Sequence, residues 1–325
     1  MRIAFVNNFF NTGGSSIASY ELAKSFSKDH EMMFVGCIDG PFREKFCELG
    51  ETLLWSSKGF DYGQDITSKL EKFSPDITHV FIPGEQNPSL FSRLPGAKKF
   101  ATVLCCQRIG FDPLAFNKVF FSSEYQRNLN SHVKNCKIVR YGIRSDEKIK
   151  EQSVFPLFGR ISSYCPSKIL QDTLLCASEV ETNNFIIAGE ILDHQYAKSL
   201  QAYAAHFNLK NLQMESNISS ERKNEVMSMI DVYHYPSSNE AFCFSILEAF
   251  SHGLPAISYK NSAIPELFDT DEWLCDNFEQ LIEKTKLMAS KSKQERQEIG
   301  MRNFNVYKKY GADIYAKTIF DSYSE

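Results

Sequence analysis

Two acidic residues interrupt an apolar stretch of the chain at residues 231–255. The stretch is predicted to begin as a buried strand, to turn before Glu240, and to continue as an apolar helix that ends at Gly253 and Pro255. Glu240 falls in the turn, and Glu248 lies on the helix among large apolar residues. A buried carboxylate needs a partner, because burying the charge alone costs several kcal/mol or more. Vicinal hydroxyls of a sugar are one such partner.

A pair of cations follows another predicted strand. Gly159 and Arg160 stand at the end of that strand, and Lys168 comes eight residues later. Ligands of open α/β sheets bind at the carboxyl ends of strands, so a guanidinium and an ammonium there could hold a diphosphate. The alternative is a pair of solvated loop cations.

A glycine-rich turn, Gly13-Gly14, follows the first predicted strand and precedes a helical pattern over residues 15–28. Glycines allow a tight turn and bring backbone N–H groups and a helix N-terminus close to an anion. Any turn between a strand and a helix can contain two glycines, so this turn alone is weak evidence.

The elements that must position these residues alternate along nearly the whole chain. Short apolar runs rich in β-branched and aromatic residues alternate with helical patterns, which indicates the α/β class with parallel sheets. The expected strands of a first sheet are residues 2–7, 32–36, 78–82, 100–104, 118–121 and 137–141. Those of a second sheet are residues 154–159, 185–189, 212–215, 231–235 and 256–259. The charged segment 144–152 reads as an exposed connector between them.

Composition agrees with two folded domains. The length of 325 residues allows about two domains at roughly 150 residues each. A formal charge of −4 has the wrong sign for a protein that binds a nucleic-acid backbone. The nine cysteines include no C-x-x-C pair, so a zinc site is improbable. No run of 18 apolar residues and no signal-peptide pattern is present, so we expect a cytoplasmic protein.

The two halves of the chain differ in charge. Residues 1–150 carry 20 basic and 16 acidic groups, and the remainder carries 16 and 24. A mildly basic first domain could favour an anionic acceptor or peripheral contact with a membrane surface, although ordinary sampling of surface charge explains the difference as well.

The sequence resembles the retaining, nucleotide-sugar-dependent glycosyltransferases of family four, which have the fold called GT-B. Glu240 and Glu248, with seven residues between them, lie in the context NEAFCFSILEAFSHGLPAIS, where the family shows an E-G-F-G-like start and an E-A-x-A-x-G-x-P-V-I-like end. The segments GGSS, FFSSEYQRN, IVRYGI, FGRI, FIIAGE and DVYHYPS match the family in its order. The resemblance implies two Rossmann-like domains whose parallel sheets face each other across a cleft. Residues 1–148 would be the acceptor domain, joined by a C-terminal helix at about 311–325, and residues 149–310 the donor domain.

The resemblance also implies a role for each matching residue. Arg160 and Lys168 would hold the diphosphate of the donor and neutralise the charge that develops on it. Glu240 would bind a hydroxyl of the donor sugar, and Glu248 the ribose hydroxyls of the nucleotide. Further donor contacts are implied for Gly13, Gly14, Gln107, Gly159, Asn217, Ile218, Phe242, Cys243, Phe244 and Ser245.

The implied reaction is transfer of a sugar from a UDP- or GDP-sugar to a glycan, lipid-linked or protein-linked acceptor, with retention of configuration. Fixed cations and backbone amides can stabilise a departing diphosphate without a metal, so we expect no metal and no cofactor besides the donor. Gln107 stands where many relatives have a histidine, which leaves open a nucleotide-sugar-binding protein that has lost catalysis. The glycine fingerprint of a nicotinamide-dependent enzyme is absent.

Overall fold

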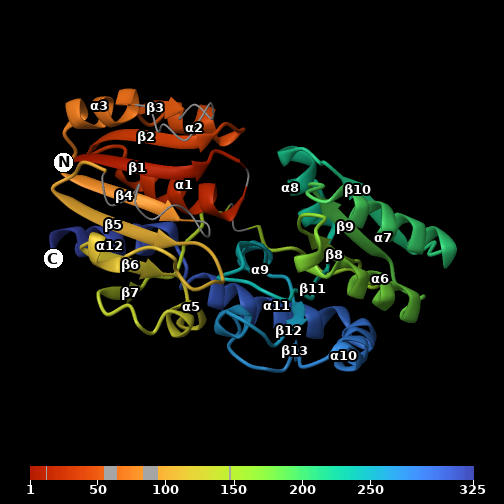
Figure 1. Cartoon of the computed structure of the whole chain (residues 1–325). Helices are drawn as coiled ribbons and strands as arrows, with labels where there is room; N and C mark the ends of the chain where they lie inside the picture. Colours follow the sequence, from red (N-terminus) through yellow and green to blue (C-terminus); the bar gives the residue numbers. More distant parts are fainter. Residues whose placement is uncertain (12, 55–63, 83–93, 146–147) are drawn as a thin grey trace. The chain divides into compact units, whose positions relative to one another are not determined.

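The computed structural model describes residues 1–11, 13–54, 64–82, 94–145 and 148–325. The chain forms two compact units. The first consists of Met1–Arg144 together with Tyr310–Glu325, and the second of Ser145–Lys309. Each unit contains one sheet whose paired strands all run parallel, with helices packed on it (Figure 1). The predicted α/β class with two Rossmann-like domains is therefore confirmed.

The first sheet has seven strands in the order β3-β2-β1-β4-β5-β6-β7. Its strands are β1 (Arg2–Phe9), β2 (Glu31–Ile38), β3 (Glu51–Leu54), β4 (Ile77–Ile82), β5 (Lys98–Val103), β6 (Lys118–Phe121) and β7 (Cys136–Ile138). The helices of this unit include α1 (Gly14–Phe26), α2 (Phe42–Cys47), α3 (Gln64–Phe73), α5 (Glu124–Leu129) and α12 (Ala312–Ser324). The strand order reverses between β1 and β4, so the turn with Gly13 and Gly14 lies beside this reversal.

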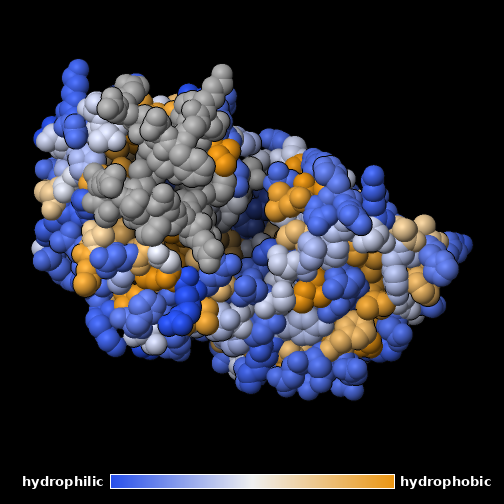
Figure 2. All heavy atoms as spheres, in the orientation of Figure 1, coloured by the Kyte–Doolittle hydropathy of each residue, from blue (hydrophilic) through white to orange (hydrophobic). Residues whose placement is uncertain are grey.

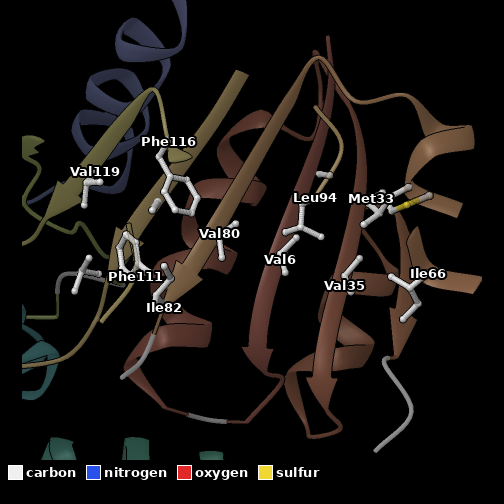
Figure 3. Close-up of a cluster of buried hydrophobic side chains, with 14 of the residues drawn as sticks. Val6, Met33, Val35, Ile66, Val80, Ile82, Leu94, Phe111, Phe116 and Val119 are labelled. Atoms are coloured by element: carbon white, nitrogen blue, oxygen red, sulfur yellow. The ribbon is translucent and has the colours of Figure 1, made fainter. Parts of the chain in front are cut away.

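Side chains alternate between the two faces of the first sheet, as strand geometry requires. Val6, Val35, Val80 and Ile82 point to one face and form a buried cluster with Ile66 of α3 (Figure 3). This cluster fixes the register of the central strands, because a slip by one residue would turn its valines to the opposite face.

The opposite face of the first sheet packs against α12. His79 of β4 is fully buried there, with Nδ1 2.5 Å from the Tyr323 hydroxyl and Nε2 2.6 Å from Thr102 Oγ1. Burial lowers the pKa of His79 to about 3. The ring of Tyr323 also contacts Phe26 of α1, with centroids 6.1 Å apart. Helix α12 is thus joined to both the sheet and α1 of the first unit.

The second sheet has six strands in the order β10-β9-β8-β11-β12-β13. They are β8 (Phe158–Ile161), β9 (Phe185–Gly189), β10 (Leu212–Ser216), β11 (Val232–Tyr235), β12 (Ala256–Tyr259) and β13 (Leu274–Cys275). The helices of this unit include α6 (Leu170–Glu179), α7 (His194–His206), α8 (Ser220–Met229), α9 (Phe244–Ser251), α10 (Phe278–Ser290) and α11 (Lys293–Tyr307). Phe158, Val232 and Ile257 of three adjacent strands share a core cluster with Leu281 and Met288 of α10.

The bounds of one predicted strand at the start of this unit are wrong. The strand predicted at residues 154–159 begins at Phe158, because the Asp231 carboxylate accepts the backbone N–H groups of Ser153 and Leu157 and holds the chain outside the sheet. Most of the described residues of the segment predicted as an exposed connector are exposed, and only its last residue, Gln152, is buried and donates to the Asp231 carbonyl oxygen. The short strands β3 and β13 were not predicted at all.

The surface of the second unit is mostly hydrophilic on the face that Figure 2 shows, with apolar residues separated by polar ones. Within the described ranges, no helix combines the length and the apolar character that crossing a membrane requires.

Candidate functional site

The candidate site of the second unit lies where its strand order reverses. From β8 the chain continues to β9 on one side, and the later strand β11 pairs with β8 on the other side. Parallel α/β sheets bind ligands outside the carboxyl ends of the strands at such a reversal. The loop after β8 carries Lys168, and the loop after β11 carries Glu240. The topology therefore brings the two predicted residues to the same edge of the sheet.

Lys168 and Glu240 are in direct contact. Lys168 Nζ lies 2.6 Å from Glu240 Oε1. The Lys168 side chain is 24% exposed and that of Glu240 11% exposed, so the pair is largely buried but still in contact with solvent. Burial opposes the charged ammonium, but the Glu240 carboxylate outweighs it and raises the pKa of Lys168. Lys168 is therefore a cation at neutral pH, with two further N–H protons beyond the one shared with Glu240.

One oxygen of Glu240 takes all of the hydrogen bonds that the carboxylate makes within the described residues. Besides Lys168, the Tyr235 hydroxyl donates to Oε1 at 3.0 Å and the Ser237 hydroxyl at 2.8 Å. The backbone N–H of Glu240 donates to Ser262 Oγ at 2.9 Å. The carboxylate is thus held at Oε1, and Oε2 is the oxygen left to accept a hydroxyl group from a ligand.

Arg160 is fully buried beneath these loops. Its guanidinium donates through Nε to Ser162 Oγ at 3.0 Å, through Nη1 to the Pro236 carbonyl oxygen at 2.5 Å, and through Nη2 to the Lys168 carbonyl oxygen. Arg160 therefore connects the loop after β8 to the loop after β11. In this conformation, a ligand at the surface of the site meets Lys168 first and the charge of Arg160 lies below it.

Glu248, the second acid of the predicted pair, lies on α9. Its Oε1 is 2.8 Å from Lys223 Nζ, and its side chain is 23% exposed. Lys223 belongs to α8, a polar helix in which sequence analysis found no functional signal. The predicted partner of Glu248 was a ribose. The structure supplies a lysine at one oxygen and leaves the other oxygen without a hydrogen bond among the described residues.

The segment between the two acids contains an unusual backbone conformation. Cys243, directly before α9, has a φ of 85°, in the left-handed region that favours glycine. Phe242 and Cys243 are buried, whereas Phe244 and Ser245 are half-buried at the start of the helix. No side-chain hydrogen bond caps α9 at its N-terminus. The turn at Cys243 thus joins the Glu240 loop to the start of α9.

Gly159, predicted to bind the donor, lies inside β8. A Cβ atom at this position would be 2.0 Å from Ile230 Cγ1. The structure thus gives this glycine a role in the close packing of the chain before β11 against the sheet.

Asn217, predicted to contact the base with Ile218, has a φ of 53°. Its backbone N–H donates to the Gly189 carbonyl oxygen at 2.7 Å, and its side chain accepts the N–H of Ile191 at 2.9 Å. The N–H of Asn217 is therefore occupied in this conformation. Ile218 follows it at the carboxyl end of β10.

The predicted residues of the first unit lie at the carboxyl edge of its own sheet. Gly13 precedes α1 and its N–H donates to Asn11 Oδ1 at 3.1 Å, while Gly14 is the first residue of the helix. Gln107 is exposed after β5, and its carbonyl oxygen accepts from Asn130 Nδ2 at 3.2 Å.

Several residues that hold the site together were not predicted from the sequence. Tyr235, Ser237 and Ser262 contact Glu240, and Lys223 contacts Glu248. The only signal for the first two was their place at the end of a predicted strand and in the turn after it. Ser262 and Lys223 gave none, because their contacts are between segments more than 20 residues apart.

Comparison with known proteins identifies the class of this fold. Residues 146–303 match the family described as Glycosyl transferases group 1. No curated protein matches the sequence. The chain is similar in structure to Anabaena HepE in complex with UDP-glucose, with a TM-score of 0.81 and 13% identity over 100% of this chain and 99% of that one. It is similar to a glycosyltransferase from Rickettsia africae ESF-5, with a TM-score of 0.79 and 14% identity over 99% and 98% of the two chains. It is also similar to WaaG, a glycosyltransferase involved in lipopolysaccharide biosynthesis, with a TM-score of 0.72 and 14% identity over 98% of each chain.

These similarities confirm the predicted GT-B type of fold. Residues 146–303 match a family of glycosyltransferases, so the predicted class of enzyme, a glycosyltransferase, is confirmed as well. The assignment to family four stays a prediction.

Proposed function

We propose that this protein transfers a sugar from a nucleotide-diphosphate donor to an acceptor hydroxyl with retention of anomeric configuration. The observation that carries the proposal is the pair formed by Lys168 and Glu240 at the strand reversal of the second sheet. A cation and a carboxylate with one open oxygen fit the two ends of a sugar diphosphate, the anionic phosphate and the sugar hydroxyls.

Glycosyl transfer has an oxocarbenium-like transition state, and negative charge accumulates on the departing diphosphate. In the proposal, the Lys168 ammonium binds the diphosphate directly and the buried charge of Arg160 adds to the positive potential beneath it. Oε2 of Glu240 accepts a hydrogen bond from a hydroxyl of the donor sugar. The oxygen of Glu248 that does not contact Lys223 accepts a hydrogen bond from a ribose hydroxyl. Fixed charges lower the barrier because they are in place before the bond breaks.

The donor is proposed to be a UDP- or GDP-sugar. The structures of HepE with UDP-glucose and with UDP and glucose make UDP-glucose the first donor to test. The acceptor is proposed to be a glycan, lipid-linked or protein-linked hydroxyl. WaaG, which functions in lipopolysaccharide biosynthesis, and TarM, whose complex contains α-GlcNAc-glycerol, make glycans and glycosylated polyols reasonable first acceptors.

Transfer is proposed to need no metal ion, because Lys168 and Arg160 supply the positive charge that the leaving group requires. Turnover should therefore persist in EDTA. Loss of turnover in the chelator, with recovery on addition of manganese, would contradict this part of the proposal.

A second candidate is a nucleotide-sugar-binding protein without catalysis. It is favoured by Gln107, an exposed neutral amide at the position where the resemblance implies a histidine. Such a protein would bind a nucleotide sugar by calorimetry but neither transfer nor hydrolyse it with any acceptor.

The experiment is a thermal-shift screen with UDP, UDP-glucose, GDP and GDP-mannose, followed by measurement of nucleotide release from the donor that binds. A ligand at a hundred times its dissociation constant stabilises a protein by about 2.7 kcal/mol. Stabilisation by one nucleotide and its sugar, with release of the nucleotide, supports the enzyme. No stabilisation by any of the four, with no release, contradicts it.

A further inference from the structure

Tyr235 contacts two charged side chains of the site, Arg160 and Glu240. Its ring centroid is 4.4 Å from the Arg160 guanidinium carbon, and its hydroxyl donates to Glu240 Oε1 at 3.0 Å. We propose that Tyr235 is a positioning residue that fixes the Glu240 carboxylate for the donor sugar. This inference rests on the proposed function, and it names a residue that sequence analysis did not find.

The hydroxyl of Tyr235 is well suited to this role because it is buried and has one proton to donate. The side chain is 2% exposed, so water does not compete for the hydrogen bond. Burial, followed by the neighbouring Glu240 charge, raises the pKa of Tyr235 well above its ordinary value. The phenol therefore stays protonated and donates to the carboxylate at neutral pH.

Glu240 needs an uncharged hydrogen-bond donor such as the Tyr235 hydroxyl, because Lys168 must contact both Glu240 and the diphosphate. When a diphosphate binds, the Lys168 ammonium must share its protons between the phosphate and Glu240 Oε1. The hydroxyls of Tyr235 and Ser237 are not needed by the diphosphate and continue to hold Oε1. Oε2 then keeps its direction while the charge on Lys168 is used by the leaving group.

The ring of Tyr235 gives the hydroxyl a fixed position. It stacks on Tyr233 of the same strand, with centroids 5.7 Å apart and ring planes 10° apart. On the Arg160 side it contacts the guanidinium that holds the carbonyl oxygens of Pro236 and Lys168. Tyr235 and Arg160 thus hold the loop after β8, the loop after β11 and the Glu240 carboxylate in fixed positions relative to one another.

Tyr233 provides a matched control. It is fully buried in β11, and its hydroxyl donates to the Ile161 carbonyl oxygen at 3.0 Å and accepts the Ile161 N–H at 3.3 Å. Tyr233→Phe removes a buried hydroxyl from the same strand and the same aromatic stack without removing a hydrogen bond from Glu240. Any effect of Tyr235→Phe beyond that of Tyr233→Phe therefore reports the contact with Glu240.

The test compares the wild type, Tyr235→Phe, Tyr233→Phe and Ser237→Ala by calorimetry with two pairs of ligands, UDP with UDP-glucose and GDP with GDP-mannose. Tyr235→Phe is expected to weaken binding of the nucleotide sugar roughly tenfold, the factor expected from one hydrogen bond to a charged group, with the free nucleotide unaffected. Ser237→Ala should weaken the same ligand, because it removes a donor from the same oxygen. Tyr233→Phe should leave both ligands within twofold of the wild type.

The inference is overturned if Tyr235→Phe binds the nucleotide sugar as Tyr233→Phe does. It is also overturned if Tyr235→Phe weakens the nucleotide and its sugar by the same factor, because that pattern reports a general loss of structure. If Tyr235→Phe does not fold, the same two comparisons are made with Ser237→Ala. The inference is overturned if Ser237→Ala binds the nucleotide sugar as Tyr233→Phe does, or if it weakens the nucleotide and its sugar by the same factor. A wild type that binds neither pair refutes the proposed function itself, and the inference with it.

Discussion

Lys168 Nζ lies 2.6 Å from Glu240 Oε1, although 72 residues separate them in the sequence. The contact joins the loops that follow two neighbouring parallel strands, β8 and β11. Each charge compensates the other in a site that is largely buried, so the site can be assembled before a ligand arrives.

Glu240→Gln should separate binding of the nucleotide from binding of the sugar. The amide keeps the size of the side chain but removes its charge, so Lys168 is left with more positive potential for a diphosphate. We expect UDP or GDP to bind at least as tightly as to the wild type and turnover of the corresponding sugar donor to fall. Calorimetry and nucleotide release measure the two effects. A parallel loss of nucleotide binding would show that Glu240 acts chiefly by holding Lys168 in place.

Gly159→Ala should destabilise the second unit through a steric clash. The new Cβ atom would lie 2.0 Å from Ile230 Cγ1, and overpacking of this kind costs about 1–3 kcal/mol. Ile230→Ala removes the clashing atoms, so the double variant should lose less stability than the two single losses predict together. Urea unfolding of the four proteins gives the coupling energy. If the two losses simply add, the glycine is not required for packing against Ile230.

At position 243, glycine should give a more stable protein than alanine, the reverse of their usual order. At a φ of 85° a side chain costs about 1 kcal/mol or more, so glycine relieves strain that alanine keeps. Both substitutions remove the buried sulfur. We expect Cys243→Gly to have the higher melting temperature, whereas alanine is usually the more stable of the two. A higher melting temperature for Cys243→Ala would mean that the left-handed conformation is not kept in solution.

His79 should make stability fall in mild acid. Its folded pKa is lowered to about 3, below the value of about 6.5 in an unfolded chain, so below pH 6.5 only the unfolded state takes up the proton. The stability contributed by the neutral ring is fully present above pH 6.5 and is lost as the pH falls toward 3. Each pH unit in this window costs about 1.4 kcal/mol, or about 2 kcal/mol at pH 5.

Urea unfolding between pH 7.5 and pH 5 measures this effect, with His79→Phe as the comparison. The phenylalanine variant loses hydrogen bonds with Tyr323 and Thr102 and should be less stable at pH 7.5. Its free energy of unfolding should nevertheless depend less steeply on pH. An unchanged slope would show that His79 is protonated in the folded protein or that its environment is open to water.

Several parts of the fold could be predicted from local sequence alone. Runs of β-branched and aromatic residues identified most strands, and the position of Glu240 and Glu248 around an apolar helix identified both acids. The two strands that were missed are β3, which is partly exposed at the edge of its sheet, and β13, which has only two residues. Such short segments bury too little to leave a clear apolar pattern.

The partners of the charged residues could not be predicted, because they come from distant segments. The type of residue at position 160 indicates a cation, but it does not show that the guanidinium lies below the loops and holds the carbonyl oxygens of Pro236 and Lys168. In the same way, an acid on an apolar helix indicates that a partner is needed. It does not reveal that Lys223 is that partner at one oxygen of Glu248.

The most direct test of the account is the rate of nucleotide release by Lys168→Ala from the sugar donor that the wild type uses. Loss of one stabiliser of the leaving group costs roughly 2.7–4 kcal/mol, so the rate should fall at least about a hundredfold. Lys260→Ala is the matched control, because Lys260 is an exposed lysine of the same unit that pairs with Asp271 at 2.7 Å. It should keep the wild-type rate. A folded Lys168→Ala variant that releases the nucleotide as fast as Lys260→Ala would contradict the account.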